Sequence, residues 1–196
     1  MTVFADALDL RSAVGDQVNN RAISDRWPYL VQMAEHQFNQ KIRTNWQESS
    51  ATLIFTDGEA TLPTDFLEMI DTYGSCNNLM HSGLRSDSKR YGMSFRTYSI
   101  ADGKIYIRGF TGDRDILYYA KIPSIANNLA GSNWLLQQFP DVYLYGVSFQ
   151  AAKYLRDTEQ TPMMDTLYKD ALKSLKIEDE RVRWANGKIR MKDVIL

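Results

Sequence analysis

The sequence predicts an α+β protein, mainly a helical bundle that carries an inserted small antiparallel β-sheet and a C-terminal extension. Apolar residues recur at helical spacing in the first and last thirds of the chain. Between these segments the pattern changes to alternation around Asp-Gly dipeptides, which favour tight hairpin turns. With 44% hydrophobic and 24% charged residues, the chain has enough apolar material to build a core.

Two helices are expected near the N-terminus, over residues 4–20 and 25–43. The apolar stripe of the first consists of Ala7, Leu10, Val14 and Val18, and that of the second of Leu30, Ala34, Phe38 and Ile42. Ser24 or Asp25 is expected to cap the second helix, and Pro28 is tolerated in its first turn. Since a short loop joins them, the two helices should form an antiparallel pair.

The middle of the chain, about residues 45–122, is predicted to be the β-rich insertion. One hairpin is expected over residues 50–62 around Asp57-Gly58, and a stronger one around Asp102-Gly103. A two-residue turn at Asp102-Gly103 places Ile100 opposite Ile105 and Tyr98 opposite Ile107. A third strand is expected at 115–120, and the loop at 74–94 has no assigned structure or role.

Two further helices are predicted over residues 140–157 and 162–176. Pro140 suits a first helical turn. Because no charged residue lies between Asp141 and Lys153, the first of these helices should be buried on most of its circumference. Gly146 would let a neighbouring element approach this helix closely. Residues 1–176 are therefore expected to form a single domain.

Residues 177–196 are predicted to form a C-terminal arm, for which a β-hairpin around Asn186-Gly187 is the candidate structure. In that hairpin Trp184 pairs with Ile189 and Val182 with Met191, and the opposite face is basic. The basic residues of that face are Arg181, Arg183, Arg190 and Lys192.

Two interpretations of this arm remain open. Either the hairpin packs its apolar face on its own domain, or the arm becomes ordered on a partner. A lone two-stranded hairpin is marginally stable in water, and an apolar end that includes Ile195 and Leu196 favours docking on a partner.

The charge and cysteine content exclude several protein classes. The 23 basic and 24 acidic residues give a net charge of −1, which does not indicate a general nucleic-acid binder or a membrane-surface protein. Cys76 is the only cysteine, so an intramolecular disulfide and a Cys-rich zinc site are excluded, and folding in a reducing cytosol is expected. We expect no signal peptide and no membrane-spanning segment.

No catalytic residue, cofactor or metal site is predicted. The two histidines, His36 and His81, lie in no metal-binding or nucleophile motif, and no phosphate-binding glycine pattern occurs. Asp65 and Glu68 are the nearest candidates for a hydrolytic carboxylate pair. For Asp65, together with Thr64, we prefer a role in capping a short helical turn.

The order of several segments resembles the head–tail adaptor (connector) proteins of tailed bacteriophages. The resemblance covers most of residues 25–176 and is strongest over 118–157. It rests on Tyr118–Ile125, Asn133–Leu136, Phe139–Gly146 and Ala151–Asp157, with Leu62–Phe66 upstream. Residues 74–94 and 177–196 match no part of the family pattern.

This resemblance implies a structural virion protein made in the host bacterial cytoplasm. It would form a homo-oligomeric ring, usually of twelve copies, between the portal protein and tail or nozzle proteins at the head–tail junction. DNA would pass through the channel without sequence-specific binding. The resemblance does not extend to residues 177–196, and our separate hypothesis is that this arm buries Trp184, Ile189 and Met191 against the portal or a neighbouring subunit. A cell-wall hydrolase and a small nucleic-acid-binding or regulatory module are the alternatives.

Overall fold

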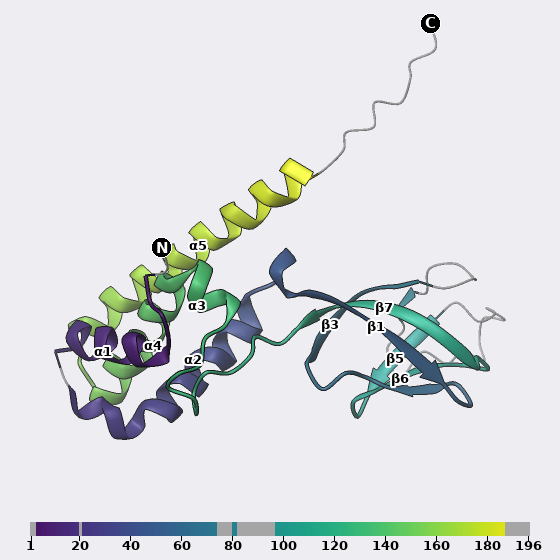
Figure 1. Ribbon diagram of the computed structural model, residues 1–196, viewed down its shortest axis with the longest axis horizontal. Helices are drawn as coiled ribbons and strands as arrows, with labels where there is room; N and C mark the ends of the chain where they lie inside the picture. The colour runs from purple at the N-terminus through teal and green to yellow at the C-terminus, as the bar shows by residue number, and fades with distance from the viewer. Residues whose placement is uncertain (1–2, 20, 74–79, 82–96, 187–196) are drawn as a thin grey trace, which may run out of the picture. The chain divides into compact units, whose positions relative to one another are not determined.

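The computed structural model describes residues 3–19, 21–73, 80–81 and 97–186 (Figure 1). The chain divides into two compact units. A helical unit comprises residues 1–46 and 122–196, and a β unit comprises residues 47–121, inserted between the two parts of the helical unit. The α+β class is confirmed.

The helical unit is built from α-helices joined by short 3₁₀ segments. Its elements are α1 (Ala7–Gln17), η1 (Arg21–Arg26), α2 (Trp27–Lys41), α3 (Trp134–Gln138), α4 (Pro140–Leu155) and α5 (Gln160–Asn186), and η2 (Asn45–Gln47) leads into the β unit. Asp6 caps α1 by accepting hydrogen bonds from the backbone N–H groups of Leu8 and Asp9. The cap expected for α2 differs, because η1 continues to Arg26, which occupies the N-cap position without a side-chain hydrogen bond. Pro28 lies in the first turn of α2, as predicted.

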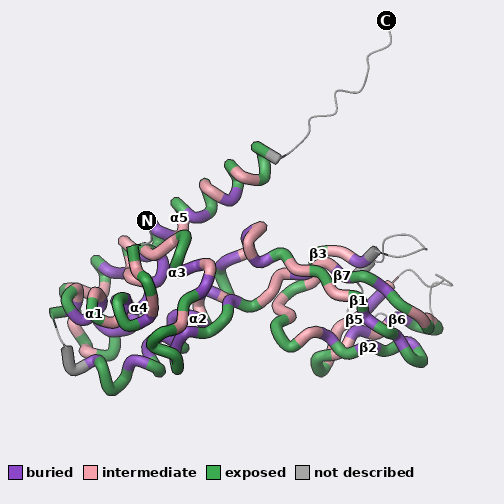
Figure 2. The backbone as a smooth tube through the Cα atoms, viewed as in Figure 1, coloured by how far each residue is buried: buried purple, intermediate pink, exposed green. Residues whose placement is uncertain are grey.

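The core of this unit forms around α4, which contacts α1, α2, α3 and α5 (Figure 2). All the stripe residues predicted for the first two helices are buried. Gly146 lies against Phe38 of α2: a Cβ atom at this glycine would be 2.6 Å from Phe38 Cε1. The predicted close approach at Gly146 is confirmed, and it explains how α2 and the nearly uncharged α4 pack together.

The β unit contains two sheets rather than one. Its strands are β1 (Glu48–Phe55), β2 (Glu59–Thr61), β3 (Phe66–Tyr73), β4 (Met80–His81), β5 (Thr97–Ala101), β6 (Lys104–Ile107) and β7 (Gly112–Ala120). One sheet has the order β1-β7-β3 and the other β2-β6-β5-β4, antiparallel except for the short parallel pair β4-β5. The apolar faces enclose a separate core that includes Phe55, Ile105 and Ile116.

The two predicted Asp-Gly turns are present. Asp57-Gly58 and Asp102-Gly103 have positive φ at both residues, as a type I′ turn requires. The pairs Ile100–Ile105 and Tyr98–Ile107 have the predicted register. At Asp57-Gly58 the hairpin is only a Thr56–Glu59 bridge, because β1 pairs with β7 and β2 with β6.

The C-terminal end of the described chain differs from the sequence prediction. α5 does not stop near residue 176 but runs to Asn186, so residues 181–186 are helical and not the first strand of a hairpin. Two acid–base pairs at helical spacing, Glu178–Arg181 and Asp179–Arg183, stabilise the added turns. The second half of the expected hairpin lies outside the described residues.

Within the described part of the chain, no helix combines the length and the apolarity needed to cross a membrane.

Candidate interaction surface

The last turns of α5 are held to the rest of the helical unit by one buried carboxylate. Asp179 is 7% exposed, and its Oδ1 accepts a hydrogen bond of 2.7 Å from the backbone N–H of Asn45. Its Oδ2 accepts a second bond, of 2.8 Å, from Arg183 Nε. These two bonds anchor α5 at Asp179, and the helix continues from there to Asn186.

Around this anchor α5 presents two large apolar side chains to solvent. Ile177 is 66% exposed and Trp184 is 78% exposed. They are seven positions apart, close to two helical turns, so they lie on the same face of the helix. Ile177 is also about 200° around the helix from the buried Leu175, so this face points away from the core of the unit. We call Ile177, Glu180 and Trp184 the α5 tip face.

The helix separates cations that the hairpin interpretation placed on one face. Arg181 donates a hydrogen bond of 2.5 Å to Glu178, and Arg183 pairs with Asp179 on another side of the helix. The continuous basic face expected for Arg181 and Arg183 is therefore wrong for this part of the chain. Each of the two cations has an acidic partner one turn earlier.

The apolar residues predicted for partner binding are also divided. Val182 is half-buried, whereas Trp184 is exposed, and the two lie on opposite sides of α5. Ile189, Met191, Ile195, Leu196, Arg190 and Lys192 lie outside the described residues. Of the predicted set, Trp184 is the described residue with the exposure that a docking role requires.

Ile177 was not among the predicted site residues. Because the helix was expected to end at residue 176, the shared helical face of Ile177 and Trp184 was not predicted. Extending the helical periodicity by three turns would have revealed it, since residues 177 and 184 repeat at the spacing of one heptad.

A second group of polar side chains lies inside the helical unit. Glu35 of α2 accepts hydrogen bonds from Ser124 Oγ at 2.5 Å, from the backbone N–H of Ile125 at 2.8 Å and from the Tyr143 hydroxyl at 3.1 Å. Asn133 donates to Tyr143 at 2.7 Å and also caps α3 through the N–H of Leu136. Burial raises the pKa of Glu35, and it also raises the pKa of Tyr143 well above its usual value.

The bonding of this group indicates a structural role. Both carboxylate oxygens of Glu35 are occupied by donors from the segment after β7 and from α4. Through these hydrogen bonds, the network links the segment at residues 124–125 to α2 and α4. Sequence reasoning missed it because its members are about 90 to 110 positions from Glu35 along the chain.

The carboxylate pair considered for hydrolysis lies on the surface of the β unit. Asp65 and Glu68 are both exposed, and Asp65 accepts a hydrogen bond from the Tyr118 hydroxyl at 3.1 Å. The expected helical turn at Thr64-Asp65 is a tight turn, closed by the bond from Phe66 N–H to Pro63 C=O. Among the described residues, no cluster of three or more His, Cys, Asp or Glu side chains could hold a metal ion.

Comparison with known protein families gives a match over nearly the whole chain. The family model described as SU10 adaptor protein matches residues 5–191, which includes the helical unit, the inserted β unit and α5. No curated protein matches the chain.

Proposed function

We propose that this chain, which belongs to the SU10 adaptor protein family, is a subunit of a ring that joins the portal of a tailed bacteriophage to its tail. Membership makes it a bacteriophage adaptor, a structural component of the virion that interacts with other virion proteins. The match over residues 5–191 is the observation that carries the proposal. The ring would hold twelve copies and would lie at the head–tail junction, between the portal and tail or nozzle proteins.

The surface of α5 supports an assembly role. Exposure of a tryptophan and an isoleucine on one helix face to water is energetically unfavourable. Tryptophan is also enriched at the centres of protein interfaces. The tip of α5 and residues 187–196 would together form the arm, residues 177–196, on the body formed by residues 1–176. In this proposal the arm becomes buried when the subunit docks on the portal or on a neighbouring subunit.

A structural role rather than catalysis agrees with the polar groups that the structure describes. Glu35 is buried and accepts three internal hydrogen bonds, and Asp65 and Glu68 are exposed on the β unit. The net charge of −1 is compatible with a channel through which DNA slides without being held.

The test is the native mass of the purified chain, alone and after mixing with the cognate portal ring. A closed ring, or a monomer that joins the portal at a fixed high stoichiometry, is the expected result. A chain that stays monomeric and does not bind the portal would overturn the proposal.

Two variants then test the arm. Truncation after Asn186 removes residues 187–196 without removing Asp179, and Trp184→Ala removes one exposed side chain. Both should weaken portal binding or ring formation while the unfolding free energy stays unchanged. Met163→Ala, at an exposed methionine in the first turn of α5, is the control that should assemble normally.

A further inference from the structure

β1 forms an open edge of the sheet that has the order β1-β7-β3. Its eight residues, Glu48–Phe55, pair with β7 in one unbroken antiparallel register, and no described strand pairs with its other side. Every second residue of such an edge strand directs its backbone N–H and C=O groups away from the sheet, where another strand can bind them.

The other described edges are less suited to an added strand. β2 has three residues and β4 has two. β3 is longer, but its pairing with β7 shifts register between Phe66 and Glu68 and again between Met69 and Asp71. Bulges of this kind twist an edge and interrupt its row of hydrogen-bonding groups. β1 is therefore the described edge on which a further strand can pair over several residues.

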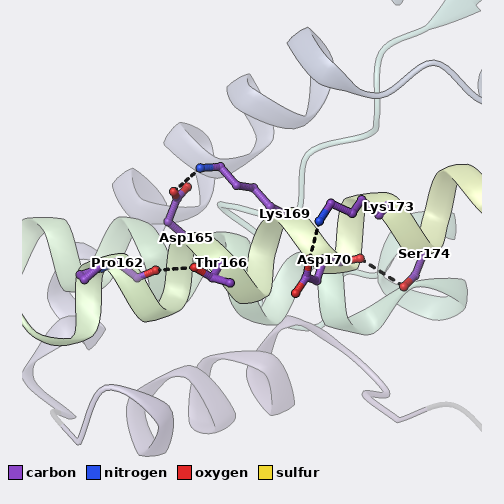
Figure 3. Close-up of polar contacts among 7 residues, drawn as sticks. All are labelled: Pro162, Asp165, Thr166, Lys169, Asp170, Lys173 and Ser174. Atoms are coloured by element: carbon purple, nitrogen blue, oxygen red, sulfur yellow. Dashed lines mark hydrogen bonds and ion pairs between the residues drawn. The ribbon is translucent and has the colours of Figure 1, made fainter.

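The side of this sheet that faces away from the core is acidic. Its three strands contain five acidic residues, and the strand register places all of them on that side. They are Glu48, Glu68, Asp71, Asp113 and Asp115. The one basic residue in these described strands, Arg114, is buried on the opposite side. On α5, by contrast, Asp165 pairs with Lys169 and Asp170 with Lys173, as Figure 3 shows. The sheet therefore favours a partner that brings positive charge.

One segment of the chain combines the alternation of a strand with positive charge. Residues 188–192, which lie outside the described residues, read Lys-Ile-Arg-Met-Lys. In an extended strand its three cations, Lys188, Arg190 and Lys192, would point to one face and its two apolar residues to the other. The segment thus has the charge and the periodicity that suit the β1 edge.

We propose that residues 188–192 of one subunit pair with β1 of a neighbouring subunit and extend its β1-β7-β3 sheet by one strand. The inference rests on the proposed ring and names the contact between its neighbours. An arm and a sheet edge are two different surfaces, each present once in every subunit, so the contact is heterologous and can close a ring. Backbone hydrogen bonds hold the added strand, and its side chains select the site.

The acidic side of the sheet can pair with the cations of the added strand. Strands of a sheet lie about 4.8 Å apart, so the cations would lie beside Glu48 and roughly 10 Å from Asp113 and Asp115 on β7. Ser50 and Thr52 of β1 lie between the added strand and β7 on this side. Both are small, so the long side chains of lysine and arginine can extend over them toward the two aspartates.

The apolar side of the added strand can pack on the core of the β unit. Ala51 of β1 packs against this core but is half-buried, whereas Leu53 and Phe55 farther along the strand are buried. Ile189 and Met191 would lie on the same side of the sheet as these residues and would cover Ala51. Removal of apolar surface from water would then stabilise the pairing.

Disulfide cross-linking in assembled rings tests the pairing. Cys76 is first replaced by serine, because it is the only cysteine. Ser50→Cys, at an exposed position of β1, is then combined with Lys188→Cys, Arg190→Cys or Lys192→Cys in the arm. The three arm positions sample successive registers on one face of the added strand. At least one pair should therefore give a ladder of covalent oligomers on oxidation.

Two matched controls test the face and the edge. Ile189→Cys and Met191→Cys place the thiol on the opposite face of the arm strand, so neither should form a ladder with Ser50→Cys. Glu68→Cys places a thiol on β3, at the other edge of the sheet, and should give no ladder with any of the three cation positions. A ladder from Glu68→Cys would overturn the assignment to β1.

The outcomes separate this contact from the ring itself. Intact rings in which none of the three pairs forms a ladder would overturn the pairing and leave the proposed function standing. Monomers that lose both thiols on oxidation would also overturn it, because the arm would then lie on its own sheet. Failure of the unchanged chain to form rings with or without the portal would overturn the proposed function and this inference with it.

A charge exchange gives an independent measurement. Arg190→Glu brings a carboxylate to the acidic side of the sheet and should weaken ring assembly at least about tenfold. Addition of Asp113→Lys in the same chain should recover part of that loss, because the two charges are then exchanged. Lys173→Glu makes the same change at an exposed cation of α5 and should leave assembly unchanged. Equal assembly of Arg190→Glu and Lys173→Glu would contradict the proposal, as would a double variant no better than Arg190→Glu alone.

Discussion

Asp179 near the end of α5 accepts a hydrogen bond of 2.7 Å from the backbone N–H of Asn45, 134 positions earlier in the chain. Asn45 begins η2, the last element before the inserted β unit. The bond therefore joins the C-terminal helix to the segment from which the insertion departs. It also explains why α5 is ordered beyond residue 176, since a helix end without tertiary contacts frays readily.

Replacing this carboxylate should release the tip of α5. Asp179→Ala removes the acceptor of the Asn45 N–H and the ion pair with Arg183, and we expect a loss of about 1–3 kcal/mol in unfolding free energy. Amide hydrogen exchange in residues 177–186 should become faster. Urea unfolding and exchange mass spectrometry measure the two effects. Asp170→Ala, which breaks an exposed ion pair, should change stability by less than about 0.5 kcal/mol, and an equal loss there would contradict the anchor.

Gly146→Ala should destabilise the helical unit although alanine is the better helix former. The added methyl group would lie 2.6 Å from Phe38 Cε1, and Phe38 is fully buried with its ring 5.0 Å from that of Tyr143. Overpacking of this kind costs about 1–3 kcal/mol, against a helix-propensity gain of about 1 kcal/mol.

Thermal unfolding of Gly146→Ala, Phe38→Leu and the double variant checks this explanation. The shorter leucine side chain should remove part of the clash, so the double variant should be more stable than the two separate losses imply. Strictly additive losses would show that Phe38 is not the residue that excludes a side chain at position 146.

Local chemistry explains what the sequence could predict of this fold. The Asp102-Gly103 turn determines the register of the strands on either side, so the pairs Ile100–Ile105 and Tyr98–Ile107 follow from a few adjacent residues. The buried stripes of α1 and α2 follow in the same way from apolar spacing. In each case the residues that decide the structure are neighbours in the chain.

Contacts between distant residues explain what could not be predicted. Alternation identified 115–120 as a strand but not its neighbours β1 and β3, which lie far away in the sequence. The Asn186-Gly187 pair has the composition of a hairpin turn, yet ion pairs within α5 and the Asp179–Asn45 bond favour helix up to Asn186. The candidate surface changed accordingly: Trp184 was predicted, whereas Ile177 was missed because the helix was expected to end near residue 176.

The two glycines of the Asp-Gly turns should respond differently to alanine. Both have positive φ, +86° at Gly58 and +71° at Gly103, so each substitution introduces backbone strain of about 1 kcal/mol. At Gly103 the new methyl group meets no atom within 4 Å. At Gly58 it would lie 2.7 Å from the Ile107 carbonyl oxygen, a backbone atom of β6. Gly58→Ala should therefore lower the midpoint of urea unfolding clearly more than Gly103→Ala. Equal midpoints would show that the β6 backbone shifts to accommodate the methyl group without loss of stability.

Glu35→Gln should remove a pH dependence from the stability of the protein. Burial raises the pKa of Glu35 above its usual value of 4.5, and the hydrogen bonds from Ser124, Ile125 and Tyr143 offset this only in part. Between 4.5 and the raised pKa, the folded state holds a proton that the unfolded state has lost. Stability contributed by this group is therefore present below pH 4.5 and is lost as the pH rises through the folded pKa.

Glutamine keeps the same shape and stays neutral. Its oxygen can accept from Ile125 N–H and the Tyr143 hydroxyl, and its amide nitrogen can donate to Ser124 Oγ, so all three contacts survive. In urea unfolding from about pH 4 to 8, the unchanged chain should lose stability relative to Glu35→Gln as the pH rises, and the difference should level off above the folded pKa. Glu35→Ala, which leaves the three donors unpaired, should be less stable than both at every pH. Parallel curves for the unchanged chain and Glu35→Gln would contradict the prediction, because they would mean that folding leaves the proton affinity of Glu35 unaltered.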